Sequence, residues 1–593
     1  MEQLDISKYA GKVNNVDVLN ADDWNAVITA IQNKVNECVK ITNVLQSSPI
    51  QSSFYVDGTL TNPINGMITL TAGTTHVLEG TLYGQIVIDA ESSQPSDNTY
   101  LKLNGVTIIT PATSGILYKT PTENKGYKDL VVTLMRDTIN TIICTTVAAK
   151  ADDQPACIYS MNNLVLQGVG YLSCINKGGH GIRGTEVRIS SPRVYVEAVH
   201  DAFHAGKVMW IDDGYFFVNK ANDAFGTGTD GVIKYYGGKI WAYGVQENVM
   251  DSKQPGYYVS APDIVATNVA AAQRVSNMTP FSGKYAAGSV KCYSDNAFSK
   301  DEEVITAADG KYTITKPYVV ITGKVEGSIV IPSIVGTTLS DGTTDHDVEI
   351  QLNDAYITSS TANVPAIQYT AGDGKVKIKV NKDTDSFVLQ TATASSTGDE
   401  DAIKSENNIS IEVKSGAHLV VKSDTQDGID GGEIKITDTS GSLLVNGCGG
   451  RGIKGNAIVI GPSATITKSH IEKYVTDTTS DDYTVMAGAV IVKDNVKSFT
   501  VSEGKANDAT VGYADIYARN GSKFSKGEFG TTDNELTGVL VTGSMAAVVT
   551  LDFGKATNVY YDNIVAGTVN NDCGKTYGDY VVCPWGKAPI VKK

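Results

Sequence analysis

The sequence predicts a mainly β protein: two tandem right-handed parallel β-helix modules, with an N-terminal helix and a C-terminal β domain. Three observations predict it. A short motif centred on one apolar residue recurs at a nearly constant interval, short segments alternate apolar and polar residues, and two distant stretches match each other. Apolar residues two apart mark strands with one buried face, and a repeat period in the low to middle twenties is typical of stacked rungs.

The motif is clearest in the second half of the chain, where its apolar residues are Ile403, Ile429 and Ile453. The turn beside each apolar residue carries Gly or a small residue, because backbone there often takes positive φ. We expect the apolar residue itself to point inward. The motif reads DAIKS at 401–405, DGIDGG at 427–432 and RGIKG at 451–455; earlier it reads ACIYS at 156–160, HGIRG at 180–184, DAFHAG at 201–206, DAFGTG at 223–228 and ENVMDS at 247–252.

An internal duplication sets the predicted domains. LKLNGVTIITPATSGILYKT at 101–120 runs parallel to IQLNDAYITSSTANVPAIQYT at 350–370. We therefore expect a docking segment with an oligomerising helix at 1–53, a first module at 54–255, a connector at 256–309, a second module at 310–500, and a C-terminal β domain or cap at 501–593.

The segment DAIKS…NNISIEVKSGAHLVVKS…DGIDGGEIKIT…GRGIKG resembles the calcium-containing, carbohydrate-binding β-helix family first associated with pectin binding in cellulose-degrading bacteria. The resemblance covers about 100 to 150 residues of each module. It implies a parallel β-helix that binds polysaccharide and holds calcium. The first module departs from the family's DGIK, with HGIR and DAFH in its place.

Composition and charge reduce the number of binding partners that can be expected. The formal net charge is −16, with no basic stripe, so nucleic acid is not an expected partner. An acidic surface also disfavours anionic lipid, but it suits cations and, through them, acidic glycans. The start MEQLDISKYAGKVNN has no apolar core, so no signal peptide is expected, and without a run of about 18 apolar residues no membrane insertion is expected.

Residues 20–46 are predicted to form a helix, with Asn20 as its N-cap. Apolar residues recur along it at alternating steps of four and three, which is the seam of a coiled coil. A lone helix this short is marginal in water, so it needs a partner: a second copy, giving a dimer or trimer, or its own β-helix as an end cap. The expected oligomerisation residues are Trp24, Ile28, Ile31, Val35, Cys38 and Leu45.

This layout of helix, linker and long β-helix resembles phage fibre and tailspike proteins. It implies a structural fibre or decoration protein of a phage virion, made in the host cytoplasm, that docks on other virion proteins and attaches to host or gut-surface glycan. A bacterial carbohydrate-binding protein and a polysaccharide depolymerase or lyase are the alternatives. With no nucleophile elbow, HExxH or P-loop in the sequence, no enzyme is expected.

Acidic residues recur at the turns, and they are the candidate metal ligands. Rungs stack about 4.8 Å apart, where like charges repel by roughly 1 kcal/mol even in water. Calcium (Ca²⁺) prefers carboxylate oxygens, and an ion bound between two carboxylates would turn their repulsion into attraction to the ion. Alternatively, each Asp hydrogen-bonds its own turn. The candidates are Asp201, Asp223, Glu247, Asp401, Asp427 and Asp430. A transition-metal site at His180, His200 and His204 is a further option, against ordinary turn surface.

Outward aromatic side chains of the first module are the candidate glycan ligands. Phasing the strands on the turns places Tyr195, Phe217 and Trp241 outward, one rung apart. Sugar rings pack on aromatic faces, so a row of rings suits an extended glycan; alternatively, the connector or a second subunit covers them. The glycan-binding candidates are Tyr195, Trp210, Phe217, Tyr236 and Trp241.

Overall fold

The chain divides into two compact units, Met1–Pro280 and Phe281–Lys593, and each is described by itself. The structure is a computed structural model. It describes residues 53–91, 95–120, 128–135, 138–147, 155–168, 170–266, 269–338, 344–370, 374–393, 399–436, 441–448 and, from 453 on, the strands whose bounds are given below.

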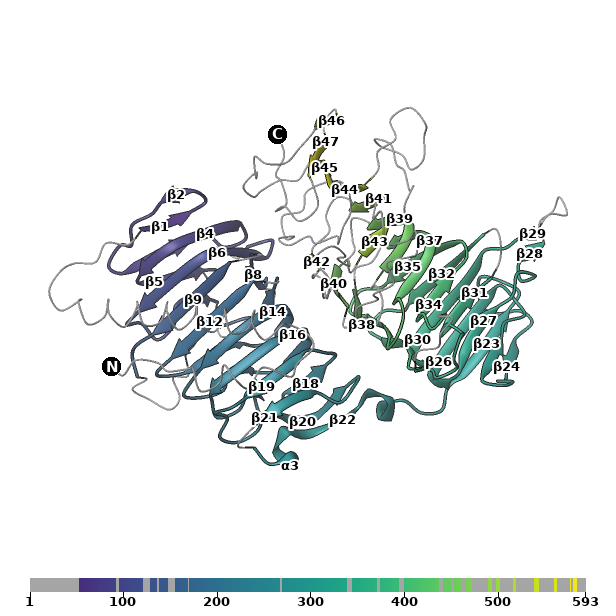
Figure 1. Cartoon of the computed structure of the whole chain (residues 1–593), viewed down its shortest axis with the longest axis horizontal. Coiled ribbons are helices and arrows are strands. Elements are labelled where there is room, and N and C mark those ends of the chain that lie inside the picture. The colour runs from purple at the N-terminus through teal and green to yellow at the C-terminus, as the bar shows by residue number, and fades with distance from the viewer. Residues whose placement is uncertain are drawn as a thin grey trace. The chain divides into compact units, whose positions relative to one another are not determined.

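The first unit is one sheet whose strands stack along the chain in order (Figure 1). Its elements are β1 (Ser53–Val56), β2 (Thr59–Leu60), β3 (Met67–Leu70), β4 (Thr75–Tyr83), β5 (Gln85–Asp89), β6 (Thr99–Thr110), β7 (Ile116–Lys119), β8 (Leu130–Leu134), β9 (Ile139–Cys144), β10 (Ala156–Ser160), β11 (Leu164–Gln167), β12 (Tyr171–Asn176), β13 (His180–Gly184), β14 (Val187–Glu197), β15 (Phe203–Ala205), β16 (Val208–Lys220), β17 (Phe225–Thr227), β18 (Val232–Tyr235), β19 (Lys239–Ala242), β20 (Met250–Tyr258), β21 (Asp263–Ala266), α3 (Ala271–Arg274) and β22 (Val275–Pro280).

The strands pair in parallel at a nearly constant interval along the chain. Ile158 pairs with Ile182, which pairs with Phe203, then Phe225, then Met250. We call each such step a rung. The predicted parallel strands and their period are confirmed here. One correction concerns the motif ENVMDS at 247–252: its third residue, Val249, matches the motif's apolar residue in sequence, but Met250 takes that place in the stack, because the turn before it holds one more residue.

Inward residues of the first unit form one continuous apolar core. Every residue that alternation predicts to point inward between 187 and 242 lies in it, so the predicted strand phase is confirmed. These are Val187, Ile189, Val194, Val196, Met209, Ile211, Phe216, Val218, Ile233, Tyr235, Ile240 and Ala242. Cys157 and Cys174 are buried free thiols in the same core.

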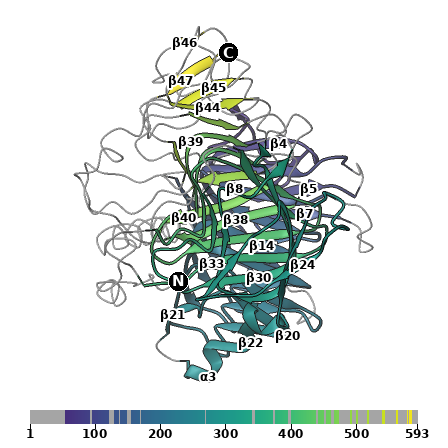
Figure 2. The ribbon, with the colours of Figure 1, turned by 90° about the vertical axis from the view of Figure 1, so that its right-hand side faces the viewer.

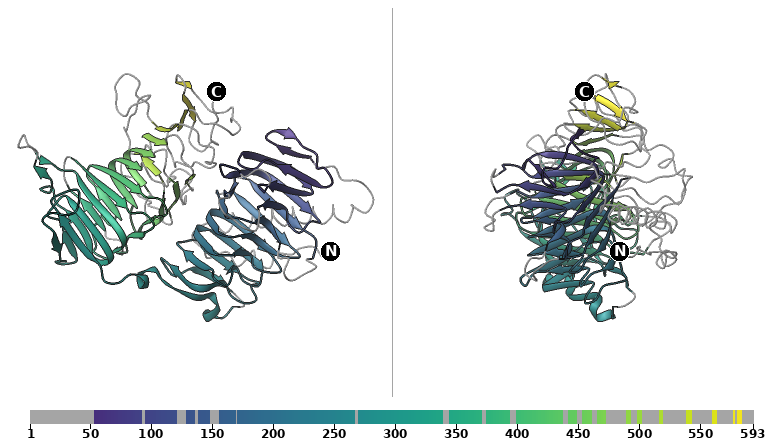
Figure 3. Two further views of the ribbon diagram at one scale, coloured as in Figure 1. Left: turned by 180° about the vertical axis from the view of Figure 1, so that it is seen from behind. Right: turned by 90° about the vertical axis from the view of Figure 1, so that its left-hand side faces the viewer.

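The second unit is a stack of the same kind; β30, β33 and β38 lie one above another in Figure 2, and Figure 3 shows the layering from behind. Its elements are η1 (Phe281–Lys284), β23 (Ser289–Tyr293), β24 (Glu303–Ile305), β25 (Lys311–Thr313), β26 (Tyr318–Glu326), β27 (Ser328–Ile331), β28 (Thr337–Thr338), β29 (Thr344–Asp345), β30 (Val348–Ser359), β31 (Ile367–Tyr369), β32 (Lys375–Val380), β33 (Asp385–Gln390), β34 (Ile403–Ser405), β35 (Asn408–Val413), β36 (His418–Ser423), β37 (Ile429–Ile436), β38 (Ser442–Cys448), β39 (Ile453–Ile460), β40 (Thr465–Ile471), β41 (Ala489–Val492), β42 (Ser498–Val501), β43 (Ile516–Ala518), β44 (Gly538–Thr542), β45 (Val559–Asp562), β46 (Thr576–Tyr577) and β47 (Tyr580–Cys583).

The matching sequence stretches fold alike. β6 and β30 each run for 12 residues and each pair with two later strands, β8 and β9 or β32 and β33. Both carry a left-handed residue at the same place, Gly105 at φ 74° and Asp354 at φ 47°. Gly and Asp are among the residues that tolerate this region, so each stretch bends within one long strand.

The stacks begin and end at other residues than the predicted boundaries. β21 and β22, inside the expected connector 256–309, extend the first sheet, while β23 opens the second with antiparallel partners β24 and β26. β1, β2 and β4 form a similar antiparallel start in the first unit, which leaves fewer unpaired edge groups. After residue 501, β43 and β44 still pair with the second stack.

The predicted N-terminal helix lies outside the described residues. So do its six seam residues, and association through them stays a prediction; they are Trp24, Ile28, Ile31, Val35, Cys38 and Leu45. Among the described residues, no helix is long and apolar enough to cross a membrane.

Candidate functional site

One face of the first unit, the charged face, carries three histidines together with acidic and basic side chains. It is built by the short strands β10, β13, β15, β17 and β20, which pair in register. Side chains next to the inward apolar residues point outward, because successive residues of a strand alternate. The outward column is therefore Tyr159, Arg183, His204, Gly226 and Asp251.

A second column lies at the first residue of β13 and in the turns that precede the next strands. Gly181 N donates to Asp201 O, Ala202 N to Asp223 O, and Ala224 N to Asn248 O. These bonds place His180, Asp201, Asp223 and Asn248 in successive rungs. Glu247, predicted to share this position, is exposed and one residue out of register, again because of the longer turn.

Three side chains of this face converge. Ligand atoms of His180, Asp201 and His204 all lie within 4.8 Å of one another, and this is the single such group of three or more among the described His, Cys, Asp and Glu residues. His204 Nδ1 lies 2.7 Å from Asp201 Oδ2, and the backbone N–H of Asp201 donates to His180 Nδ1 at 3.1 Å. The ring of His200 lies 5.4 Å from that of His180, centroid to centroid. The histidines are therefore more than turn surface.

Burial shifts the protonation of this cluster. His180 is buried, and desolvation together with the charge of His204 lowers its pKa to about 3. Burial opposes the charge of Asp201, yet the hydrogen bond from His204 and the charge of His180 hold its pKa below the usual value. Asp223 is the opposite case, because desolvation and the neighbouring acids raise its pKa to about 7. The face thus pairs neutral imidazole with an ionised carboxylate.

Charged partners continue on either side of the cluster. The guanidinium of Arg183 lies over the ring of Tyr159, 5.2 Å from its centroid. Lys253 pairs with the buried Asp251 two residues before it and leaves half of its own side chain exposed. Arg183, Tyr159 and Lys253 were not among the predicted site residues. Tyr159 and Arg183 directly follow the motif's apolar residues, so the alternation could have located these two.

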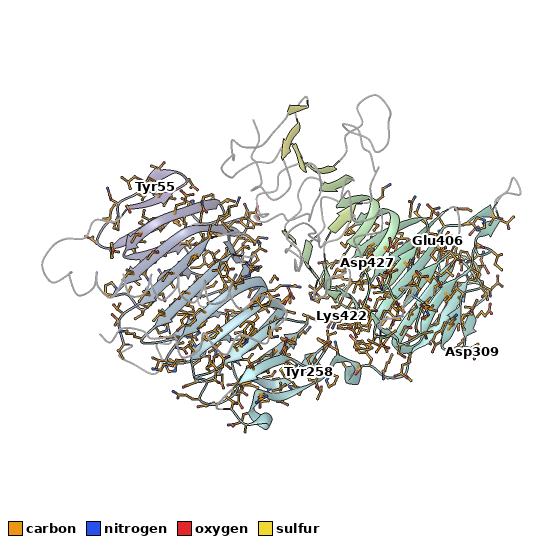
Figure 4. All side chains as sticks on the ribbon, in the orientation of Figure 1. Tyr55, Tyr258, Asp309, Glu406, Lys422 and Asp427 are labelled. Carbon is orange, nitrogen blue, oxygen red and sulfur yellow. The ribbon has the colours of Figure 1, made fainter. Side chains whose placement is uncertain are left out.

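The predicted turn acids of the second unit lie in a different setting. Asp427 N donates to Asp401 Oδ1 at 3.0 Å, so these two occupy successive turns as expected, and Asp427 lies among the strands of that unit (Figure 4). Asp430 instead pairs in register with Lys404, whose Nζ lies 3.5 Å from Asp401 Oδ2. Burial opposes the charge of Lys404, but Asp401, Asp399 and Asp430 hold its pKa above the usual value. Lysine therefore compensates part of this negative charge.

Calcium at the turn acids stays a prediction, and the donor sets differ between the units. In the first unit, Asp201 faces imidazole nitrogens, which calcium disfavours. In the second, Asp401 and Asp427 are buried oxygen donors, and the nearby Glu400 is fully buried with an Oε2 that has no hydrogen-bond partner among the described residues. The second unit is the better match for a calcium ion.

Adding millimolar calcium to chelator-treated protein is therefore expected to raise the melting temperature, since a ligand held only by the folded state stabilises it. Asp427→Asn should reduce that shift, because it removes a buried carboxylate. Asp223→Asn is the matched variant in the first unit and should leave the shift unchanged. Equal shifts in all three proteins, measured by differential scanning calorimetry, would contradict a site at Asp427.

The predicted aromatic ladder exists, but it is not exposed. Tyr195 pairs in register with Phe217, and Phe217 with Trp241, yet only 1–2% of each residue is accessible. The rings of Tyr195 and Phe217 stack 5.5 Å apart, and Tyr243 contacts Phe217 at 5.2 Å. The prediction that these side chains point away from the core is confirmed, but the prediction that they are exposed is wrong. Burying an apolar ring against other parts of the chain is more favourable in free energy than leaving it in water.

The other two predicted aromatics also differ from expectation. Tyr236 is buried, while Trp210 is half-buried between Arg188 and Lys234 of the neighbouring rungs. Four of the five residues are therefore buried, and the five do not offer a row of open rings to a glycan.

Comparison with known proteins adds one match. A family model described as a carbohydrate-binding domain-containing protein matches residues 65–278. That span runs from β3 into β22, so it includes the charged face and the aromatic ladder. Searches of curated proteins and of solved structures gave no match.

Proposed function

We propose that the chain is a non-enzymatic carbohydrate-binding protein and that its first unit binds a hydroxyl-rich polysaccharide across successive rungs of the charged face. The observation that carries this is the family model over residues 65–278. The parallel register, repeated from rung to rung in both units, supports their further assignment to the right-handed parallel β-helix class.

The chemistry of the face suits such a ligand. Tyr159, Arg183 and His204 are half-buried, so they are rigid yet reachable. Arginine donates in a planar fork that can bridge two neighbouring hydroxyls or a uronate carboxylate, and the half-exposed Lys253 can donate to the same groups. Each rung adds about 4.8 Å, so an extended chain can follow the column. The buried aromatic ladder offers no comparable access.

Arg183→Ala is expected to weaken polysaccharide binding about ten- to a hundred-fold, because a hydrogen bond to a charged group contributes roughly 1.5–3 kcal/mol. The measurement is isothermal titration with a polysaccharide selected from a glycan panel. Arg193→Ala is the matched control: Arg193 also lies over a tyrosine, 4.9 Å from the centroid of Tyr171, but on another strand layer.

Equal loss in the Arg183 and Arg193 variants would contradict the charged face as the binding surface. Unchanged chain length of the polysaccharide after incubation is the expected result for a binding protein. Release of oligosaccharides would instead support the depolymerase alternative.

We further propose that the chain serves as a fibre or decoration protein of a phage virion. The heptad seam of residues 24–45 and the two tandem strand stacks support this assignment, since fibres combine a docking and assembly segment with a long β-rich shaft.

Ile31→Asp is expected to convert a dimer or trimer into a monomer, since it places a charge in the apolar seam. Sedimentation equilibrium of the full chain measures the change, and Gln32→Asp, one residue outside the seam, is the control. An oligomer that survives Ile31→Asp would contradict assembly through this seam.

A further inference from the structure

We propose that His180, Asp201 and His204 bind one divalent transition-metal ion, of which Zn²⁺ is the best match, and that the ion joins two successive rungs of the first unit. This inference goes beyond carbohydrate binding and does not rest on it.

The three ligands come from two neighbouring rungs. His180 opens β13, while His204 lies in β15 and Asp201 in the turn just before it. Pairing of Ile182 with Phe203, and the bond from Gly181 N to Asp201 O at 3.1 Å, fix the two rungs against each other. The backbone thus places all three side chains without help from a ligand.

The carboxylate of Asp201 faces one ring nitrogen of each histidine. Asp201 Oδ2 lies 2.7 Å from His204 Nδ1 and 3.6 Å from His180 Nδ1. Because His180 Nδ1 accepts the backbone N–H of Asp201, it carries a lone pair and no proton. A carboxylate oxygen and an imidazole lone pair at this separation repel each other, and a cation bound between them attracts both.

The donor set selects the metal. Two imidazole nitrogens with one carboxylate are ligands that Zn²⁺ takes in proteins, usually with four in all, whereas Ca²⁺ prefers oxygen alone. The side chains of Asp201 and His204 are 14% and 15% exposed, so the fourth position is open to a water molecule. Three protein ligands and one water is the arrangement of an accessible zinc site.

The next rung leaves room for this carboxylate. Gly226 pairs in register with His204, and a Cβ added at Gly226 would lie only 2.6 Å from Asp201 Oδ2. Any larger residue there would push the carboxylate away from the two histidines. Gly226→Ala therefore tests the site without removing a ligand.

Metal binding moves one proton and replaces one hydrogen bond. His204 Nδ1 donates its proton to Asp201 Oδ2; when the ion takes the Nδ1 lone pair, this proton shifts to Nε2 of the same ring, which stays a neutral imidazole. His180 Nδ1 gives up the hydrogen bond from the backbone N–H of Asp201 to bind the ion, and no redox step is involved. Zinc affinity is expected to fall as the pH is lowered, because protons compete with the ion for the ligand lone pairs.

The experiment uses the full chain, stripped with chelator and dialysed, and titrates it with Zn²⁺ by calorimetry; Co²⁺ reports coordination through its visible absorption. One Zn²⁺ per chain is expected. Asp201→Asn and His204→Gln should each weaken binding by more than the roughly 10- to 100-fold that loss of an outer-shell partner costs, and Gly226→Ala should weaken it as well. His200→Gln is the control and should keep full affinity, because His200 lies beside the cluster but outside the ligand group.

Circular dichroism of each metal-free variant checks that it folds. His204→Gln changes a partly exposed side chain, so it is the ligand variant that should disturb folding least. Absence of zinc binding by the unaltered chain would overturn the proposal. Equal affinity in all variants would overturn it too, as would a loss in His200→Gln as large as that in His204→Gln. Glycan titrations of the same proteins separate this result from the proposed carbohydrate binding.

Discussion

Trp241→Ala is expected to lower the free energy of unfolding of the first unit by about 3–5 kcal/mol, the range for truncating a buried aromatic residue. Trp241 is 1% exposed. Its ring stacks with that of Tyr215 at 6.4 Å, and Lys239 Nζ lies 5.6 Å from its centroid. The substitution removes these contacts and leaves a cavity in the aromatic ladder of the first unit.

Urea denaturation of the full chain, with hydrogen exchange of peptides that contain β19, measures this loss and assigns it to the first unit. Tyr55→Ala is the control, because Tyr55 is 39% exposed at the start of the same unit (Figure 4) and its loss should change stability by no more than about 0.5 kcal/mol. A Trp241→Ala protein of unchanged stability that no longer binds glycan would restore the aromatic ladder as the binding surface.

Asp212→Ala is expected to destabilise the first unit by a similar amount, about 3–5 kcal/mol, because it leaves the charge of Arg188 without its carboxylate partner. The carboxylate of Asp212 is fully buried and receives Arg188 Nε at 2.8 Å, Arg188 Nη2 at 3.2 Å and Ser190 Oγ at 2.6 Å. Asp212 is the extra residue of a bulge, since Ile211 and Asp213 pair with the adjacent Ile189 and Ser190.

A double-mutant cycle tests the pairing, with chemical denaturation as the measurement. Arg188→Ala together with Asp212→Ala should cost clearly less than the sum of the two single variants, because the double variant leaves neither charge alone. Glu91→Ala, which breaks the solvent-exposed pair with Lys119, should leave the denaturation midpoint unchanged. Additive losses would show that Arg188 and Asp212 act independently.

The sequence located some of the acidic turn residues correctly and misplaced one of them. Asp201 and Asp223 were located by their place in the repeated turn, and the structure does set them in successive rungs. Glu247 shares the same sequence pattern, yet one more residue in its turn moves it out of register and into solvent. Pattern matching counts positions, whereas the hydrogen-bonded register depends on how each turn folds.

Alternation and period were sufficient for the β class, the parallel register and the inward residues, because a strand has two faces and a stacked rung repeats the same faces. Only the tertiary structure decided the solvent access and the partners of the side chains outside that core. Tyr195 and Trp241 point away from it and are buried all the same, while His180, Asp201 and His204 meet across two rungs. The physical reason is that alternation sets the direction of a side chain, and its solvent access and partners depend on segments far away in the chain.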